Sequence, residues 1–293
     1  DERTRSFLKI QDGCDYWCAY CTIPGARGRS RNAPIAEIVD NARLIAGKGI
    51  KEIVLTGVNI GDFGKSTRES FIELLYALDQ LDGVERYRIS SVEPNLLTDE
   101  IIRFVADSAK FAPHFHIPLQ GGADQILKMM GRRYDTRFFA GRIDQINDIF
   151  KRASIGIDVI VGFPGETDEL FEESYRFLER LDFSYLHVFN YSKRPATRAE
   201  KMKGHLPPTV REQRSKLLIE LSNQKKRNFY KKNIGTSQSV IFEDRLSDGY
   251  MFGFTGNYIN VRASYDQRRV NALSQVKLSE PDEEFNWLNS TLF

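Results

Sequence analysis

The sequence of 293 residues lacks a long hydrophobic run, because no stretch of about 18 apolar residues occurs in it. A membrane-spanning helix is therefore not predicted. Residues 1–6 are charged and polar, unlike the apolar centre of a secretory signal peptide. An excess of one charge is also missing, since 42 Lys and Arg face 40 Asp and Glu and leave a net charge of +2. A chain this close to neutral binds nucleic acid only through local patches. We expect a cytoplasmic protein with no membrane partner.

Cysteine is scarce but concentrated. The three cysteines of the chain, Cys14, Cys18 and Cys21, fall within one C-x3-C-x2-C segment. Their odd number argues against a disulfide framework, and structural zinc is usually closed by four ligands. An iron–sulfur cluster is also held by thiolates, and three of them leave one iron open for a cofactor or substrate. The spacing predicts such a cluster, with a zinc-stabilised site as the alternative.

Short β-branched runs alternate with amphipathic stretches from residue 6 to about residue 190. Strands are expected at residues 7–10, 53–56, 87–90, 115–119, 157–161 and 186–189. The helical stretches between them include residues 35–47, whose apolar residues share one face. Strands that alternate with helices favour an α/β fold with a parallel sheet. Six such units, each strand followed by polar or Gly-rich residues, predict a partial (β/α)6 barrel with its chemistry at the carboxyl ends of the strands.

The last third of the chain has a different pattern. Residues 209–232 are helical and carry eight Lys and Arg against two Glu, a local charge of +6. Short alternating runs with turn residues follow, at 238–242, 250–254, 258–262 and 275–278. They predict a small antiparallel β-barrel. We therefore expect a core over residues 1–208, a basic linker helix over 209–233 and a small domain over 234–293.

Motifs after successive strands resemble a known family. The cysteine segment, with Tyr20 before its last cysteine, continues as Ile-Pro-Gly-Ala-Arg-Gly-Arg-Ser-Arg over residues 23–31. Further motifs occupy residues 55–59, 90–94, 116–120, 130–134, 162–167 and 191–195. Together they resemble radical S-adenosylmethionine enzymes, and among these the tRNA and ribosomal-protein methylthiotransferases. Residues 11–14 and 55–61 are most similar to the branch that acts on N6-threonylcarbamoyladenosine in tRNA.

The resemblance implies a radical-SAM barrel followed by a TRAM domain, an OB-like module that binds RNA. It also implies a [4Fe-4S] cluster on the three cysteines, with S-adenosylmethionine bound at the open iron. The residues carried over as cofactor contacts are Tyr20, Gly57, Asn59, Ser91, Glu93, His116, Gln120, Arg132 and Gly162.

Several of these residues have plainer explanations beside the functional one. Tyr20 could simply pack the cysteine loop, Gly57 could serve a strand-to-loop turn, and Arg132 could be a solvated charge at a helix end rather than a partner of the methionine carboxylate. His116 and Gln120 lie an even number of residues apart, so a regular strand would place both on one face. Polar side chains inside a barrel are costly unless they are hydrogen-bonded.

The small domain contributes candidate RNA contacts. Tyr258, Asn260 and Arg262 alternate along one expected strand, where an aromatic ring and a cation suit stacked bases and phosphates. Arg268 and Arg269 would add phosphate contacts. The plainer reading is core packing for the tyrosine and a solvated surface for the arginines. The partner implied by the resemblance is the anticodon stem-loop of tRNA.

Family members carry a second [4Fe-4S] cluster on three further cysteines, which this sequence does not contain. We therefore expect a fragment of a longer enzyme that, when complete, adds a methylthio group to C2 of N6-threonylcarbamoyladenosine next to the anticodon and takes electrons from a one-electron donor protein. Isopentenyladenosine in tRNA or a ribosomal-protein aspartate is the alternative target. A zinc-stabilised RNA-binding module without catalysis is the alternative of another class.

Overall fold

The computed structural model describes residues 4–293. Six parallel strands form its larger part: β1 (Arg5–Lys9), β2 (Glu52–Thr56), β3 (Arg86–Ile89), β4 (His114–Gln120), β5 (Ser154–Val161) and β6 (Tyr185–Asn190). They are hydrogen-bonded as two sheets, β1-β2-β3 and β4-β5-β6. Single bridges from Tyr87 to Phe111 and from Ser91 to His116 connect the two sheets. The predicted α/β partial barrel of six strands is confirmed.

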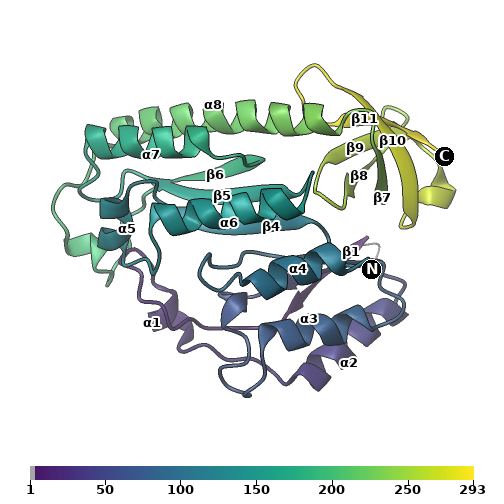
Figure 1. The fold of residues 1–293 in the computed structure, drawn as a ribbon, viewed down its shortest axis with the longest axis horizontal. Helices are drawn as coiled ribbons and strands as arrows, with labels where there is room; N and C mark the ends of the chain where they lie inside the picture. Colours follow the sequence, from purple (N-terminus) through teal and green to yellow (C-terminus); the bar gives the residue numbers. More distant parts are fainter. Residues whose placement is uncertain (1–3) are drawn as a thin grey trace.

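Helices follow the strands and cover their outer face (Figure 1). They are α2 (Ile35–Gly47), α3 (Phe71–Asp79), α4 (Asp99–Asp107), α5 (Asp124–Met130), α6 (Thr136–Ile149) and α7 (Asp168–Arg180). The short α1 (Ile23–Arg27) lies beyond the end of β1 and is largely exposed. Ser70 and Glu73 form a capping box at the start of α3, which satisfies amide groups of its first turn. Outward strand residues such as Leu55 and Ile157 are fully buried beneath these helices. Burial of this apolar face against the helices is what holds the barrel together.

The opposite face of the same strands is polar. Because side chains alternate along a strand, residues between the buried apolar ones point away from the helices. They include Glu52, Arg88 and Asp158. Glu52 and Arg88 are each 3% exposed, and their charges are paired with one another. Buried charge on this scale requires partners, and the second part of the chain provides several of them.

That second part is a closed five-stranded β-barrel made of β7 (Ser237–Ser247), β8 (Tyr250–Thr255), β9 (Asn260–Ser264), β10 (Leu273–Pro281) and β11 (Leu288–Leu292). Its core includes Phe242 and Met251, both fully buried. Every pair of strands in it is antiparallel except β11 with β9. The predicted small barrel is confirmed, although β11 was not expected, because residues 288–292 carry only a weak apolar pattern.

The small barrel docks on the amino ends of the large-barrel strands. Arg86 donates to the carbonyl oxygens of Ser239 and Phe254, each at 3.0 Å. Arg88 donates to the carbonyl of Gly256 at 3.0 Å, and its guanidinium lies over the ring of Tyr258, 4.7 Å from the centroid. These charge-assisted bonds join the two parts through backbone groups of the small barrel.

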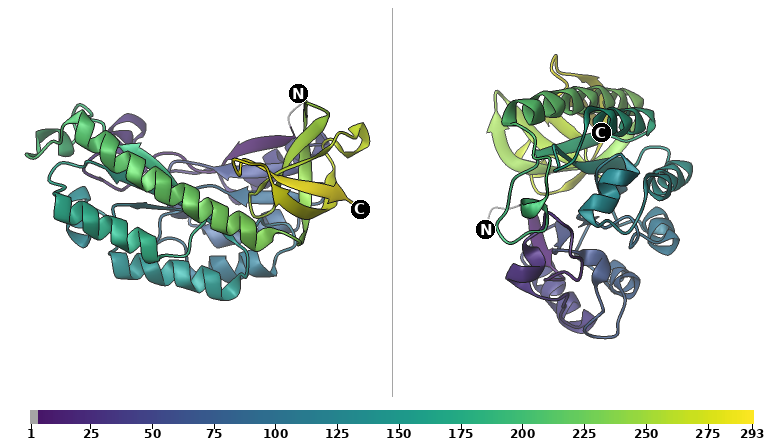
Figure 2. Two further views of the ribbon diagram at one scale, coloured as in Figure 1. Left: turned by 90° about the horizontal axis from the view of Figure 1, so that it is seen from above. Right: turned by 90° about the vertical axis from the view of Figure 1, so that its left-hand side faces the viewer.

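Helix α8 (Pro208–Asn233) runs along β6 and then reaches the small barrel (Figures 1 and 2). Leu218 and Leu221 belong to the core of the large barrel, whereas Phe229 and Tyr230 belong to that of the small one. The helix predicted as a linker is therefore packed over its length. The domain limits themselves stay predictions.

Part of the positive charge of α8 is neutralised by ion pairs with acidic residues of the large barrel. Arg214 pairs with Glu166 and, at 2.6 Å, with Asp168. Lys232 pairs with Asp182 at 2.8 Å. The +6 charge that the sequence suggested for RNA binding is thus smaller on the free surface. No helix among residues 4–293 has the length and apolar character to cross a membrane.

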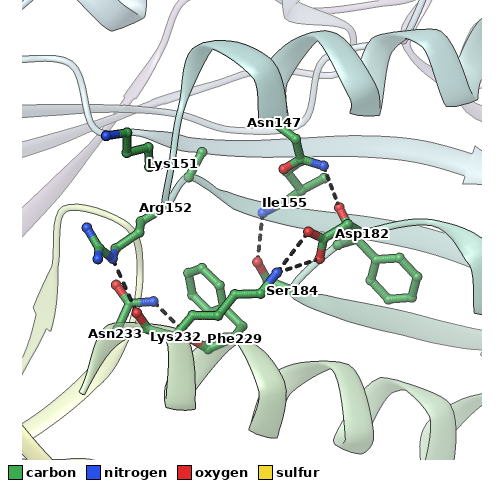
Figure 3. Close-up of a pocket in the computed structure, with 11 residues that line it drawn as sticks. Asn147, Lys151, Arg152, Ile155, Asp182, Ser184, Phe229, Lys232 and Asn233 are labelled. Atoms are coloured by element: carbon green, nitrogen blue, oxygen red, sulfur yellow. Dashed lines mark hydrogen bonds and ion pairs between the residues drawn. The ribbon is translucent and has the colours of Figure 1, made fainter.

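The last of these pairs borders a small pocket at the amino ends of β5 and β6 (Figure 3). Its volume is about 30 Å³. Lys232 reaches across it to Asp182, and Arg152 donates to the carbonyl of Lys232 at 3.2 Å. Apart from Lys151, the polar side chains labelled there are hydrogen-bonded, so the pocket is a small junction between α8 and the sheet.

Candidate functional site

The cysteine loop lies between β1 and α1, at the carboxyl end of the first strand. Its backbone is tied down from several sides. The amide of Cys14 donates to the carbonyl of Gly28 at 3.1 Å, and the amide of Ala19 donates to the carbonyl of Met130 at 2.8 Å. The amide of Cys21 donates to the carbonyl of Cys18 at 3.1 Å. The loop is therefore a held structure that presents three thiols together.

Each cysteine sulfur has a hydrogen-bond donor. The amides of Tyr16 and Ile23 lie 3.3 Å and 3.4 Å from the Sγ atoms of Cys14 and Cys21. Burial raises the pKa of both of these thiols. Buried thiolates then require a bound metal or a cation for stability. Three thiols with donors aimed at sulfur fit a thiolate-held cluster, whose properties depend on such hydrogen bonds.

Cys18 is contacted by a cation, Arg132. One guanidinium nitrogen lies 3.1 Å from its Sγ and 3.3 Å from the hydroxyl of Tyr20. The other terminal nitrogen pairs with Glu93, and the Arg132 side chain is only 2% exposed. Burial acts to lower the pKa of Arg132, but the neighbouring Tyr134, Tyr20 and Glu93 outweigh it and raise the pKa. Arg132 is therefore a buried cation at the cysteine loop, not a solvated helix-end charge.

Tyr134 extends this network to β4. Its hydroxyl accepts a hydrogen bond from Nε of Arg132 at 2.9 Å and donates to the carbonyl of Pro118 at 2.6 Å. Burial raises its pKa. Sequence reasoning did not single out this residue, although it belongs to the quoted segment 130–134. The network links the cysteine loop, the end of β3 and the end of β4.

Gln11 is a second residue that sequence reasoning missed. Its side chain is 2% exposed. Its oxygen accepts from the amides of Val58 and Asn59 at 3.0 Å and 2.8 Å, and its nitrogen donates to the carbonyl of Gly13 at 2.8 Å. Gln11 thus fastens the cysteine loop to the loop after β2. The sequence signal for it was its place in the segment of residues 11–14, which resembles the family, although the resemblance implied no separate role for Gln11.

This fastening explains Gly57. A Cβ atom on Gly57 would lie 2.8 Å from the carbonyl oxygen of Gln11 and 2.7 Å from Ile60 Cγ2. Glycine is therefore required at position 57 by the close packing of the residues Gln11 and Ile60, and not only by a bound cofactor. Asn59 lies nearby, and the Nδ2 atom of its side chain is 4.0 Å from Cys14 Sγ and 3.1 Å from Oδ2 of Asp62.

The remaining predicted cofactor contacts lie at or below the carboxyl ends of β3, β4 and β5. Ser91 bridges to His116. Gln120 has φ of 73° and follows a register shift in β4, so the expected regular alternation from His116 to Gln120 is wrong. Gly162 has φ of 74° and makes room for the side chain of Arg211 on α8. The structure joins Tyr20, Glu93 and Arg132 directly, whereas His116 belongs to another cluster.

A cavity of about 340 Å³ adjoins the cysteine loop. Its lining includes Cys14, Trp17, Gly28 and Arg29. Trp17 is 69% exposed although it is a large apolar side chain. The volume falls in the range of small-molecule sites. One thiol therefore opens onto a space in which a cofactor or substrate could be held.

The three candidate RNA contacts expected on one strand face, Tyr258, Asn260 and Arg262, are not all on one strand, since β9 begins at Asn260. Tyr258 precedes β9 with φ of 64°, so its expected place in a strand with Asn260 and Arg262 is wrong. Its ring lies 5.0 Å from that of Phe254 and 4.6 Å from that of His114, within the contact between the two parts.

Of the other four candidates, Asn260, Arg262 and Arg269 are half-buried like Tyr258, and Arg268 is exposed. Asn260 donates to the carbonyl of Asn286 at 3.2 Å, and Arg262 donates to Asn289 at 2.6 Å. Arg268 pairs with Asp266 and its side chain is 88% exposed, while Arg269 donates to the carbonyl of Phe293. Of these side chains, that of Arg268 is the most open to a phosphate.

The fold has relatives among solved structures. The Escherichia coli structure described as "Coproporphyrinogen III oxidase (HemN)", a radical SAM enzyme, superposes with a TM-score of 0.57 at 19% identity, over 76% of this chain and 53% of that one. At this identity the likeness concerns the fold alone.

Sequence comparison is more specific. The profile of the radical SAM superfamily matches residues 8–178. Threonylcarbamoyladenosine tRNA methylthiotransferase MtaB of Aquifex aeolicus is 40% identical over 89% of this chain and 62% of its own length. The protein of the same name from Bacillus subtilis is 37% identical over 97% of this chain and 64% of its own. The chain thus spans somewhat less than two thirds of these relatives. As the motifs predicted, it belongs to the radical SAM superfamily, where its curated relatives are methylthiotransferases.

Proposed function

We propose that this chain is the radical-SAM part of a tRNA methylthiotransferase that adds a methylthio group to C2 of N6-threonylcarbamoyladenosine next to the anticodon. The observation that carries the proposal is the held loop of three thiols, each with a donor at its sulfur, at the end of a six-stranded parallel barrel. The identity of 40% to an enzyme of that name supports the substrate.

In this proposal Cys14, Cys18 and Cys21 hold a [4Fe-4S] cluster through three of its irons. The cluster and S-adenosylmethionine, when bound, supply the radical chemistry. The protein contributes position and electrostatics. Arg132, paired with Glu93, places a buried positive charge beside Cys18. This charge would offset the negative charge of the thiolates and could bind an anionic group of the cofactor.

The neighbouring residues of the proposed cofactor site have supporting rather than chemical tasks. Tyr20, Gly57 and Asn59 shape the wall beside the cysteine loop, and Ser91, Gln120 and Gly162 end strands at the same edge of the barrel. Since ligands of parallel barrels bind at the carboxyl ends of strands, these positions are where the cofactor and the adenosine would meet.

The complete enzyme would require more than these residues. We propose that a second [4Fe-4S] cluster, a one-electron donor protein and the anticodon stem-loop of tRNA take part, as the resemblance implies. Arg262, Arg268 and Arg269 on the small barrel would add phosphate contacts.

Anaerobic reconstitution tests the cluster. The chain should bind about four iron and four sulfide per molecule with a brown colour, as expected for thiolate-held clusters. Replacement of Cys18 by alanine should abolish this. Stoichiometric zinc in a colourless protein would instead favour the RNA-binding module without catalysis.

Arg132 gives a sharper test of the site. Arg132→Met in the full-length enzyme should keep the cluster but slow cleavage of S-adenosylmethionine by about 10- to 100-fold, the usual effect of losing a supporting polar partner. Arg137→Ala, an exposed arginine on α6, is the matched control and should be unchanged. Equal rates for both variants would remove Arg132 from the site.

The substrate is settled in cells. Mass spectrometry of tRNA nucleosides from a strain that lacks the full-length gene should show loss of the methylthio group from threonylcarbamoyladenosine. Loss from isopentenyladenosine, or from a ribosomal-protein aspartate, would transfer the assignment to the alternative target. No loss in any of them would reject methylthio transfer.

A further inference from the structure

Three polar side chains meet on the inward face of the barrel, away from the cysteines. His116 lies on β4, Asp158 on β5 and His187 on β6, three strands that are adjacent in one sheet. They alternate with Ile117, Ile157 and Leu186, which are buried in the main core beneath the helices. His116, Asp158 and His187 therefore point away from the helices, toward the inner face of the barrel.

Their ligand atoms converge. Nε2 of His116 lies 2.8 Å from Oδ1 of Asp158, and Nδ1 of His187 lies 3.3 Å from the same oxygen. The three atoms are all within 4.8 Å of one another. Zinc bonds of about 2.0–2.2 Å in a tetrahedron place ligand atoms roughly 3.3–3.6 Å apart, so small side-chain rotations would suffice.

We propose that His116, Asp158 and His187 form a site for one divalent transition-metal ion of the zinc class. Two imidazoles and one carboxylate suit such ions, and three protein ligands leave a coordination position open. Solvent can reach the site from the side of His187, because the His187 side chain is 52% exposed while those of His116 and Asp158 are 12% and 18% exposed.

Tyr185 supplies the outer contact that metal-binding histidines usually have. Its hydroxyl lies 3.4 Å from Nδ1 of His116 and 2.9 Å from Nε2 of His114. A hydrogen bond from Nδ1 of His116 to that oxygen would leave Nε2 free as the ligand atom and would fix the ring. All three ligands stand on paired strands, which suits a preorganised site.

The site is separate from the cysteine loop. His116 is four residues before the end of β4, and Asp158 and His187 are each three residues before the ends of β5 and β6. At about 3.3 Å per residue, the metal would sit roughly 10–13 Å below the carboxyl edge of the barrel. The inference thus goes beyond the proposed function, since its test requires neither S-adenosylmethionine nor tRNA.

Metal titration tests the site. The full chain, first loaded with iron and sulfide so that the cysteines are occupied, is desalted and titrated with Co²⁺ and with Zn²⁺. One further ion per chain is expected, with a Co²⁺ spectrum of nitrogen and oxygen ligands and no strong thiolate charge-transfer band. Absence of binding, or a thiolate spectrum, would overturn the proposal.

Variants locate the ion. His116→Ala, Asp158→Ala and His187→Ala should each weaken Zn²⁺ binding by more than about tenfold, and Tyr185→Phe by about tenfold. His205→Ala, at an exposed histidine elsewhere, should bind as the unchanged chain does. Unchanged affinity in the three ligand variants would refute the assignment.

If a variant fails to fold, the ligands of the ion are identified on the unchanged protein instead. X-ray absorption at the zinc edge of the loaded chain should then show imidazole nitrogen and oxygen neighbours. A shell of sulfur neighbours would overturn the proposal.

Discussion

Replacing Glu52 by glutamine should destabilise the folded chain by about 3 kcal/mol. The carboxylate side chain is 4% exposed, as are those of Arg86 and Arg88, to which it is bonded at 3.3 Å and 3.4 Å. Removing one partner of a buried ion pair usually costs about 3–5 kcal/mol, because the remaining charge stays buried. Glutamine keeps the volume, so no cavity contributes.

We expect the lower end of this range of destabilisation because the small barrel supplies further hydrogen-bond acceptors to both arginines. Both arginines also donate to backbone carbonyls there, Arg86 to Ser239 and Phe254, and Arg88 to Thr255 and Gly256. These acceptors remain when the carboxylate is lost, and each charge-assisted bond moderates the penalty. The docking of the small barrel should weaken at the same time, since the arginines carry it.

The assay is urea unfolding followed by circular dichroism at neutral pH. Glu85→Gln is the matched control, because Glu85 makes only a half-exposed pair with Lys51 at 3.7 Å. Its effect should stay within about 0.5 kcal/mol. A Glu52→Gln variant within about 1 kcal/mol of the unchanged chain would refute the reasoning, because the charge would then contribute no more than an exposed pair does.

The effect should depend on pH with a definite sign. Burial acts to raise the pKa of Glu52, but Arg88, Arg86 and Arg5 outweigh it and lower the pKa. A lowered carboxyl pKa gives stability that is complete above the unfolded value of about 4.3 and is lost as the pH falls through the folded value. The difference between the unchanged chain and Glu52→Gln should therefore be full at pH 7 and shrink below about pH 4.

Three further changes probe other parts of the structure. Gly57→Ala should cost about 1–3 kcal/mol because its Cβ has no room, whereas Gly47→Ala, with open space around it at the end of α2, should be neutral or stabilising in the same thermal melts. Tyr258→Ala should destabilise the chain by about 2–3 kcal/mol through loss of the ring between the two parts, measured by urea unfolding. Arg268→Ala should leave stability unchanged but lower the salt slope of tRNA binding by about 1 in filter assays.

Each of these has a contrary outcome. Equal melting of the two glycine variants would show that the crowding at Gly57 is relieved without cost. A Tyr258→Ala variant that keeps full stability and loses only tRNA binding would restore the RNA role predicted for it. An unchanged salt slope in Arg268→Ala would remove that residue from the phosphate contacts.

Periodicity predicted the large barrel well because its strands are buried and its helices are amphipathic. Periodicity does not predict local structure where contacts between distant parts of the chain determine it. Tyr258 occupies a left-handed turn that residue type does not favour, and β11 forms because neighbouring strands are available to pair with it. The charge of α8 was overestimated because Arg214 meets Glu166, a residue 48 positions away, in the folded chain.

The site shows the same division. Spacing alone identified Cys14, Cys18 and Cys21, since their chemistry is local. Gln11 was missed because glutamine is ordinarily a surface residue and its partners after β2 lie 47 and 48 positions along the chain. The cluster of His116 with Asp158 depends on strand register, which no local pattern supplies.

Helix α8 has a mechanical consequence. It starts beside the carboxyl ends of β5 and β6, where Arg211 lies against Gly162 and bonds to the carbonyl of Tyr191, and it finishes in the core of the small barrel. Its 26 residues, at 1.5 Å each, make a helix of about 39 Å whose middle packs in the core of the large barrel and whose carboxyl end packs in that of the small one. Such a rod acts as a ruler between the two ends of the molecule. Under the proposed function, an RNA that touched the small barrel while one of its bases reached the carboxyl ends of the large-barrel strands would have to span a distance of about this length.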